Sequence, residues 1–412
     1  MKKFLIILIG VVLLSATPFY CANLDLVQQE TEVPKAPTLI QNKELPTPVI
    51  EKPRYAPITR QDIPIYPIYP MSPATTEYYN CTNMAQVAQY VSTAMTNFQK
   101  DIKIKYTGKD YDGWINRNLY NIFENVYRID TMTNLNDGER LHYSFSYATT
   151  DYTYYDNSEL ITIHMYYRNG LDKAKQDKTD AWIRNEYKKL NVQGKSEYKR
   201  FLEIYKYCIK PKYDTTFQKW SDYDVMAYGT TVCSGYAMLL DKMCEVAGID
   251  CRCATGHTNG VADYTEYHAW NYVKIDGKWY FCDPCWDEPD NGKYFNYFLI
   301  SYKSPQFKNR LLDDHFYGNT KNSAILGQSI FTMLPMSQSD YKITVKYDTK
   351  KGNKISSKKC RPGVEISLKK PKRSGYKFVY YYTTINGKKK RVKRFEFVPF
   401  ENVTVHAKWK RI

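Results

Sequence analysis

The chain has 412 residues, which is enough for two or three domains with sizeable cores. Its net charge of +16 is concentrated near the C-terminus. Residues 341–412 carry 22 Lys or Arg and 4 Asp or Glu, whereas all other residues together carry 37 Lys or Arg and 39 Asp or Glu. This distribution excludes a uniformly basic protein. Beyond the first residues no segment is long and apolar enough to cross a bilayer, so we expect no transmembrane segment in the mature chain.

Residues 1–22 are predicted to be a secretory signal peptide. Two lysines follow the initial methionine, and an apolar run over residues 4–14 comes next, which is the order typical of such signals. The run is too short for a transmembrane helix. We therefore expect a secreted or cell-surface protein. Lipid anchoring at Cys21 is the less favoured alternative, because the two aromatic residues before it are not the small residues that a lipoprotein signal needs.

The next two segments differ in composition. Residues 23–76 are polar and rich in proline, which predicts an extended, semi-rigid linker. Residues 77–195 are expected to be α+β, with a helix over 83–100 and strands at 143–147 and 160–167. We interpret this region as the N-terminal part of the unit that follows, rather than as an independent enzyme.

Residues 196–330 contain the most informative helix. After a first helix over 196–210, a second is predicted to begin at Cys233 and to end at Gly248, a common residue just after helices. Ser234 is expected to cap its first turn. A cysteine at a helix N-terminus meets the positive end of the helix dipole, which favours the nucleophilic thiolate. The apolar positions with helical spacing are Tyr236, Leu239, Leu240, Met243, Cys244 and Ala247.

A hairpin is predicted further along the same region. Asp276-Gly277 is a strong type I′ turn signal between two strand-like runs. Counting back from this turn, His268 opposes Cys285 and Trp270 opposes Asp283. His268 and Asp283 are then diagonal neighbours on one face, about 7 Å apart, close enough for their side chains to hydrogen-bond. A slip of one residue would place them on opposite faces.

Cys233, His268 and Asp283 are together the groups that thiol-based acyl transfer requires. Such chemistry needs a thiolate, a base that generates it and a third group that orients the base. Taken singly, each has a simpler explanation, since a buried cysteine is usually a small hydrophobic residue. The agreement of helix start, hairpin geometry and residue order favours the catalytic interpretation.

Three short motifs around these residues resemble the transglutaminase-like superfamily, whose architecture is related to papain-type thiol proteases. They are Cys233–Ala237 (CSGYA), His268–Trp270 (HAW) and Asp283–Trp286 (DPCW). The resemblance implies an α+β papain/transglutaminase-like core, in which a helix carrying the cysteine packs on an antiparallel sheet carrying the histidine and the aspartate. It further implies Cys233 as nucleophile, His268 as general base and acid, and Asp283 as the group that orients the histidine. The Cys233 N–H would contribute to an oxyanion hole, with Tyr228 as a weaker candidate for the second donor.

Residues 340–412 are predicted to form a small basic β module. Strand-like runs occur at 343–347, 364–368, 376–382 and 403–409, with a hairpin turn at Asn386-Gly387. The Gly-Tyr-Lys-Phe stretch from Gly375 and the final Ala-Lys-Trp resemble the internalin-type B repeat, which implies a β-grasp-like fold. The positive charge favours an anionic cell-envelope polymer as partner. Export argues against nucleic acid, and a lysine-rich surface without any partner remains the simpler alternative.

The ten cysteines suit an oxidising compartment, and several are expected to form disulfides. Four of them surround the proposed site: Cys251, Cys253, Cys282 and Cys285. Free thiols, or a metal ion bound by these four, are the alternatives, although the C-x-C spacing suits a zinc site poorly. We expect no cofactor and no resident metal.

These patterns lead to one functional prediction and one alternative. The prediction is an exported or surface-associated cysteine-dependent enzyme that acts on amide bonds of proteins or peptides. An amine that resolves the thioester would make it a crosslinking transglutaminase, and water would make it a peptidase or amidase. The alternative is a non-catalytic surface scaffold or adhesion protein that binds anionic envelope polymers.

Overall fold

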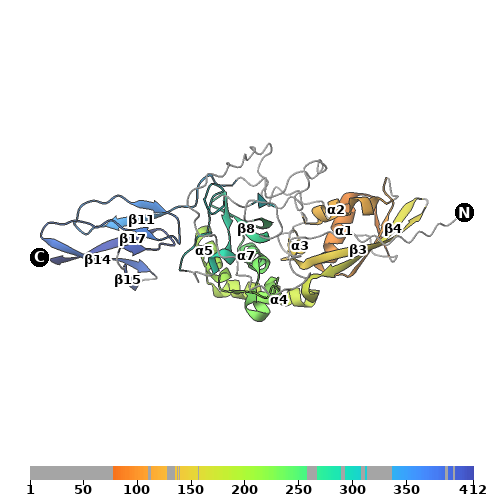
Figure 1. The fold of residues 1–412 in the computed structure, drawn as a ribbon, viewed down its shortest axis with the longest axis horizontal. Helices are drawn as coiled ribbons and strands as arrows, with labels where there is room; N and C mark the ends of the chain where they lie inside the picture. The colour runs from red at the N-terminus through yellow and green to blue at the C-terminus, as the bar shows by residue number, and fades with distance from the viewer. Residues whose placement is uncertain are drawn as a thin grey trace, which may run out of the picture.

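The computed structural model describes residues 78–109, 113–127, 135–136, 138, 140–155, 157–257, 267–288, 293–307, 311–312, 336–385, 388–392 and 395–412. The predicted signal peptide and linker lie outside these residues, as does the predicted turn at Asn386-Gly387. An N-terminal sheet, a central helical and sheet core, and a C-terminal sheet follow one another along the long axis (Figure 1). No helix within the described ranges is long and apolar enough to cross a membrane.

The N-terminal part is a four-stranded sheet covered by helices, as the alternating and helical patterns predict. Its strands have the order β1-β2-β4-β3, with β1 parallel to β2 and the other pairs antiparallel. Asn83 caps α1, because its side chain accepts a hydrogen bond from the Gln86 N–H. The strand expected from residue 143 begins only at Phe145, since the preceding residues form a short helix. In chain order the elements are β1 (Tyr79–Cys81), α1 (Met84–Thr96), β2 (Asp101–Tyr106), α2 (Trp114–Val126), α3 (Arg140–Ser144), β3 (Phe145–Tyr155) and β4 (Ser158–Tyr167).

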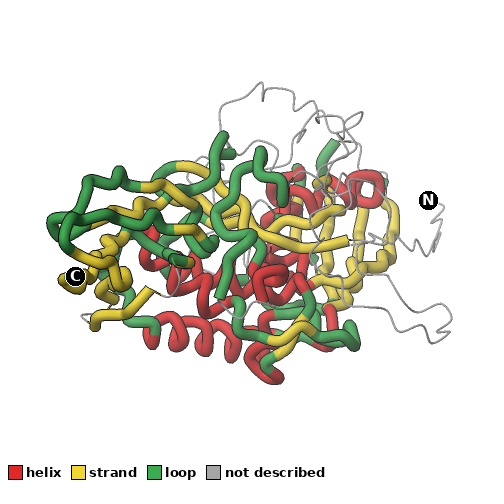
Figure 2. Tube along the Cα trace, turned by 60° about the vertical axis from the view of Figure 1, so that its left-hand side comes forward, coloured by secondary structure: helices red, strands yellow, loops and turns green. Residues whose placement is uncertain are grey.

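Helices in the central part surround one buried helix, α7 (Cys233–Val246). Every residue from Cys233 to Cys244 is buried, because α4, α5 and α6 pack around α7 together with two strands of the next sheet (Figure 2, helices in red). The predicted stop is confirmed: Gly248 has φ +68°, and the Ile249 N–H donates to the Cys244 carbonyl at 2.9 Å. The elements before α7 are η1 (Arg168–Gly170), α4 (Lys173–Lys189), α5 (Glu197–Cys208), β5 (Lys212–Tyr213), α6 (Asp222–Tyr228) and β6 (Thr230–Thr231).

The second sheet carries the predicted hairpin. Its order is β10-β7-β8-β9, formed by β7 (Cys251–His257), β8 (Tyr267–Ile275), β9 (Lys278–Cys282) and β10 (Leu311–Leu312). The predicted register is confirmed, because Ile275 pairs with Lys278 and Asn271 with Cys282, around a turn in which both Asp276 and Gly277 have positive φ. The ladder stops there. The expected pairs of His268 and Trp270 with residues 285 and 283 do not form, since Pro284 begins the short helix α8 (Pro284–Asp287).

The C-terminal sheet packs directly against the core. Its order is β12-β11-β17-β14-β15, and β13 and β16 form a separate pair. The Phe295 N–H donates to the Gly363 carbonyl at 2.8 Å, the rings of Phe295 and Phe400 lie 4.9 Å apart, and the Tyr198 hydroxyl donates to the Phe400 carbonyl. The strands are β11 (Ile343–Asp348), β12 (Lys358–Cys360), β13 (Ile366–Ser367), β14 (Tyr376–Ile385), β15 (Lys388–Val392), β16 (Glu396–Phe397) and β17 (Val403–Arg411).

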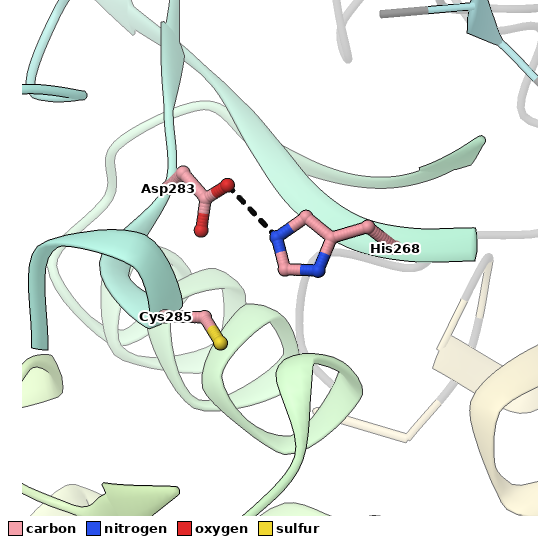
Figure 3. Close-up of side chains that lie close together, drawn as sticks. All are labelled: His268, Asp283 and Cys285. Atoms are coloured by element: carbon pink, nitrogen blue, oxygen red, sulfur yellow. Dashed lines mark hydrogen bonds and ion pairs between the residues drawn. The ribbon is translucent and has the colours of Figure 1, made fainter. Parts of the chain in front are cut away.

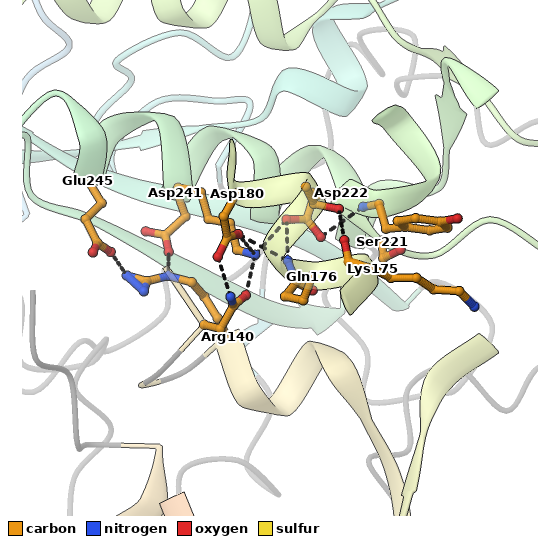
Figure 4. Close-up of polar contacts among 12 residues, drawn as sticks. Arg140, Lys175, Gln176, Asp180, Ser221, Asp222, Asp241 and Glu245 are labelled. Carbon is orange, nitrogen blue, oxygen red and sulfur yellow. Dashed lines mark hydrogen bonds and ion pairs between the residues drawn. The ribbon is translucent and has the colours of Figure 1, made fainter. Parts of the chain in front are cut away.

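Buried ion pairs join α7 to the elements beside it (Figure 4). The fully buried Lys242 ammonium lies 2.7 Å from the Asp222 carboxylate of α6 and 3.4 Å from that of Asp180 in α4. Nearby, Arg140 of α3 pairs with Asp241 at 2.7 Å and also with Glu245. A buried charge is tolerated only when it is paired in this way. The pairs therefore hold α3 from the N-terminal part, α4 and α6 in one arrangement around α7.

Candidate active site

Cys233 is the first residue of α7, as predicted, but its surroundings differ from the expectation in one respect. The residue at the N-cap position is Val232, which makes no capping hydrogen bond, and the Ser234 hydroxyl instead donates to the Trp220 carbonyl. The prediction that Ser234 caps the helix is therefore wrong. The thiol of Cys233 lies at the helix end where backbone N–H groups have no intrahelical acceptor, which is the environment an oxyanion requires.

The glycine of the CSGYA motif has a steric explanation. A Cβ atom on Gly235 would lie 2.0 Å from the Thr231 hydroxyl oxygen and 2.8 Å from the Ser221 carbonyl oxygen. Both distances are far below a normal contact, so only glycine fits there. The start of α7 thereby approaches the chain at Ser221 and Thr231 closely, and this approach fixes where Cys233 lies.

His268 and Asp283 meet, although not through strand pairing. The imidazole Nε2 lies 2.9 Å from Asp283 Oδ2, and both side chains are buried (Figure 3). Asp283 is the N-cap of α8, because its other oxygen accepts a hydrogen bond from the Trp286 N–H at 3.0 Å. The Trp286 ring stacks on the imidazole with centroids 4.9 Å apart. The Asp283 carboxylate thus both orients the His268 imidazole and caps α8. Trp286 of the same helix fixes the plane of the imidazole by stacking on it.

The environment of His268 favours its charged form. Burial alone lowers the pKa of the imidazole, but the charge of Asp283, the neighbouring Cys233 and the hydrogen bonds to both raise it, so that the pKa of His268 becomes about 9. The structure thus brings the three predicted residues together: His268 hydrogen-bonds Asp283, and Cys233 lies close enough to the imidazole to raise its pKa.

Further side chains lie at this site, and of these Cys285 was predicted to lie near it, whereas Tyr213 was not. Cys285 follows Pro284 in α8, and one donor atom from each of Cys285, His268 and Asp283 lies within 4.8 Å of the others. Tyr213 and Trp286, both partly exposed, pack against the buried cluster that contains Cys233. The prediction that Cys285 lies beside the site is confirmed. Nothing in the sequence indicates Tyr213, which lies beside Thr231 only because β5 pairs with β6.

Tyr228, the weaker candidate for a second oxyanion donor, points away from buried surroundings. Its side chain is 59% exposed, and the Lys219 ammonium lies 4.1 Å from its ring centroid. A donor must lie within about 3 Å of the developing oxyanion in a site from which water is excluded. The exposed Tyr228 ring does not offer that environment.

The predicted disulfides are not formed in the described part of the chain, where all nine cysteines are buried free thiols. The sulfur atoms of the cluster have other neighbours. The Asn271 amide lies 3.6 Å from Cys251 Sγ and 3.7 Å from Cys253 Sγ, and the Leu299 N–H donates to Cys282 Sγ at 3.3 Å. Burial raises the pKa of the Cys282 thiol well above its usual value, which keeps it protonated.

A second buried carboxylate, that of Asp287, anchors α8. Asp287 accepts hydrogen bonds from the Tyr205 hydroxyl of α5 and the Asn296 N–H, each at 2.7 Å. Burial raises the pKa of this carboxyl to about 7 despite these hydrogen bonds. The contacts fix the short helix that carries Trp286 and begins at Asp283.

Comparisons with known proteins found similarities to part of this chain. The model of the transglutaminase-like superfamily matches residues 187–284. The kyphoscoliosis peptidases of Mus musculus and Homo sapiens are each 29% identical to this chain over 130 residues. The matched segment covers 29% of the chain and 20% of each relative, so the chain spans about a fifth of the length of these relatives. The structure of a candidate cysteine protease from Cytophaga hutchinsonii aligns with this chain at 15% identity and a TM-score of 0.23. The alignment covers 33% of this chain and 61% of that protein.

The family match ends at Pro284 and includes the nucleophile helix, the strand of His268 and the capping residue Asp283. Residues 187–284 are therefore similar to the transglutaminase-like superfamily, and this segment contains the hydrogen-bonded pair His268 and Asp283.

Proposed function

We propose that this protein is a cysteine-dependent acyl-transfer enzyme acting on amide bonds of proteins or peptides. One observation carries the proposal: the buried His268 imidazole hydrogen-bonds Asp283 through Nε2, and Cys233 lies close enough to the same ring to raise its pKa. A buried imidazole that lies beside both a carboxylate and a thiol is the arrangement that nucleophilic cysteine catalysis needs. We further propose that residues 1–22 direct export, so that the enzyme acts outside the cytoplasm.

The roles follow from these positions. The His268 imidazole, whose raised pKa favours the protonated ring, holds the proton that leaves the Cys233 thiol, and the thiolate attacks the carbonyl carbon of the substrate amide. The N–H groups at the start of α7 stabilise the negative oxygen of the tetrahedral intermediate. The imidazolium then gives its proton to the leaving amine, and the C–N bond breaks. Asp283 keeps the ring in place and stabilises its positive charge, and an amine or water finally cleaves the thioester.

The test measures both possible second steps with the purified chain. A casein-type acceptor protein is incubated with a fluorescent primary amine, while released amines and new N-termini are followed in parallel. We expect covalent labelling of the acceptor for a transferase, or new N-termini or released ammonia for a hydrolase. In either case pretreatment with iodoacetamide should lower the amount of product formed in proportion to the fraction of Cys233 that is alkylated. Neither product, over a panel of unfolded and native acceptors, would argue for the non-catalytic scaffold.

A second candidate function is supported by the outer face of the C-terminal sheet. Tyr380 pairs with Lys408, and Tyr382 pairs with His406 on one side and Arg391 on the other. Paired residues share a face of a sheet, so these cationic and aromatic side chains point the same way. Arg391 lies over the Tyr380 ring at 4.5 Å. We propose that this face binds an anionic envelope polymer whose repeating charges meet the cations on successive strands.

The second proposal has its own experiment. Binding of glycerol-phosphate teichoic acid to the full chain is measured at several salt concentrations. Lys389 belongs to this face too, since its ammonium lies 5.4 Å from the centroid of the Tyr382 ring. Changing both Lys389 and Arg391 to Glu should weaken binding about tenfold or more and reduce its salt dependence, because two cations of the face are lost. Lys188→Glu with Lys189→Glu is the matched control, since it makes the same charge change on exposed α4 positions. Equal weakening in both double variants, or tighter binding to duplex DNA, would refute the proposal.

A further inference from the structure

The residue between Pro284 and Trp286 gives this site a second thiol. Cys285 is 5% exposed, His268 6% and Asp283 0%, and one donor atom from each lies within 4.8 Å of the others (Figure 3). The acyl-transfer chemistry above uses His268 and Asp283 but leaves Cys285 without a role. A thiol, an imidazole and a carboxylate that converge from buried positions are the ligand types that bind zinc.

We propose that His268, Asp283 and Cys285 form an inhibitory site for Zn²⁺. Metal binding at these three residues does not require Cys233 to be the nucleophile, whereas its inhibitory effect rests on the proposed function. A thiolate and an imidazole favour Zn²⁺ over Mg²⁺ or Ca²⁺, which prefer oxygen ligands only. Three protein ligands leave the fourth tetrahedral position for a water molecule. The ion would be an inhibitor here and not a cofactor.

The geometry requires small adjustments only. Tetrahedral zinc with bonds of about 2.0–2.3 Å places its ligand atoms about 3.3–3.8 Å apart. The Nε2–Oδ2 contact of 2.9 Å has to widen by about half an ångström, and the Cys285 sulfur has to approach by at most about one. Two further contacts orient the ligands. The backbone N–H of Trp286 donates to the other Asp283 oxygen, and the Trp286 ring stacks on the His268 imidazole.

The charges balance when the metal binds. Zn²⁺ replaces two protons, the Nε2 proton of the His268 imidazolium and the thiol proton of Cys285. The product contains one thiolate, one carboxylate, one neutral imidazole and the dication, so it carries no net charge, which suits a buried site. The ion also takes the place of the hydrogen bond between His268 Nε2 and Asp283 Oδ2, so the carboxylate no longer orients the imidazole and acyl transfer stops.

The test measures metal binding in a chain that lacks the nucleophile. Co²⁺, which replaces zinc spectroscopically, is titrated into the full-length Cys233→Ala variant, and Zn²⁺ is then added as competitor. We expect a thiolate-to-cobalt charge-transfer band, tetrahedral visible bands, and their loss when Zn²⁺ displaces Co²⁺. Adding Cys285→Ser should remove the charge-transfer band and weaken binding by about tenfold or more. Adding Cys208→Ser, at another buried thiol, should leave both unchanged.

Several outcomes would refute the zinc site. A charge-transfer band that survives Cys285→Ser would place the metal on another thiol. A band seen with wild type and absent in Cys233→Ala would place it on the nucleophile. If Cys285→Ser fails to fold, X-ray absorption of the zinc-loaded Cys233→Ala chain replaces it, with one sulfur at about 2.3 Å expected and only nitrogen or oxygen ligands as the contrary result. Because the chain lacking Cys233 is used throughout, failure of the zinc site and failure of the proposed enzyme activity remain distinguishable.

Discussion

Replacing Cys233 with alanine is expected to abolish amide-bond turnover, with a fall in kcat of about 10⁴-fold or more. Removing the nucleophile of such a series leaves only the contribution of substrate binding and the oxyanion donors. The fold should survive, because alanine is a good helix former and removes only one buried sulfur atom. Turnover is measured on purified protein, and circular dichroism with thermal unfolding shows whether the variant is folded.

The matched control for this prediction is Cys360→Ala. Cys360 is also a buried free thiol, but it lies on β12 of the C-terminal sheet. That variant should keep its kcat close to the wild-type value. If Cys233→Ala retained a tenth of the wild-type turnover while correctly folded, the proposed role of Cys233 would have to be abandoned. If both alanine variants lost turnover equally, a general effect of thiol removal would explain the result.

Replacing Asp283 with asparagine is expected to lower kcat/KM by about 10²–10⁴-fold and to move the alkaline limit of activity to lower pH. The structure raises the pKa of His268 above its ordinary 6.5 to about 9, and the Asp283 charge is the largest favourable contribution. The protonated ring therefore persists up to about pH 9 in wild type and loses its proton at higher pH. Without the carboxylate charge the ring should lose its proton nearer to neutrality.

The raised pKa of His268 also makes the stability of the fold depend on pH. Because the pKa of His268 in the folded state exceeds that of the unfolded chain, its contribution to the free energy of unfolding is fully present below about pH 6.5 and is lost as the pH rises through about 9. Tm should therefore fall over this range in wild type and less steeply in Asp283→Asn. Asparagine is also a good N-cap, so α8 should persist in the variant. Activity and Tm are measured from pH 6 to 10 with a chelator present.

An unchanged alkaline limit in Asp283→Asn would contradict the proposed orientation of the imidazole. In that case a group other than His268 would govern the high-pH decline. Tm of His268→Gln separates these cases, because this variant lacks the titrating ring and should lose the fall in Tm near pH 9 together with turnover.

Local signals in the sequence were sufficient for the elements that carry the site. The helix from Cys233 to its glycine stop and the hairpin around Asp276-Gly277 were predicted with correct register, since each depends on a few neighbouring residues whose conformational preferences are strong. The meeting of His268 and Asp283 was also predicted, but for a partly incorrect reason. The ladder ends before Asp283, and this residue reaches the imidazole as the cap of a helix begun by Pro284.

What only the tertiary structure decided depends on contacts between segments far apart in the chain. Tyr213 lies near Cys233 because β5 pairs with β6. Packing of the strands likewise decides that Cys251 and Cys253 meet the Asn271 amide, whereas Cys282 meets the Leu299 N–H. The raised pKa of His268 likewise requires burial and an adjacent charge at once. The sequence by itself determined which groups could perform thiol chemistry and on which elements they lie. Their separations, burial and protonation were decided by packing, because these quantities depend on the three-dimensional surroundings that no local pattern encodes.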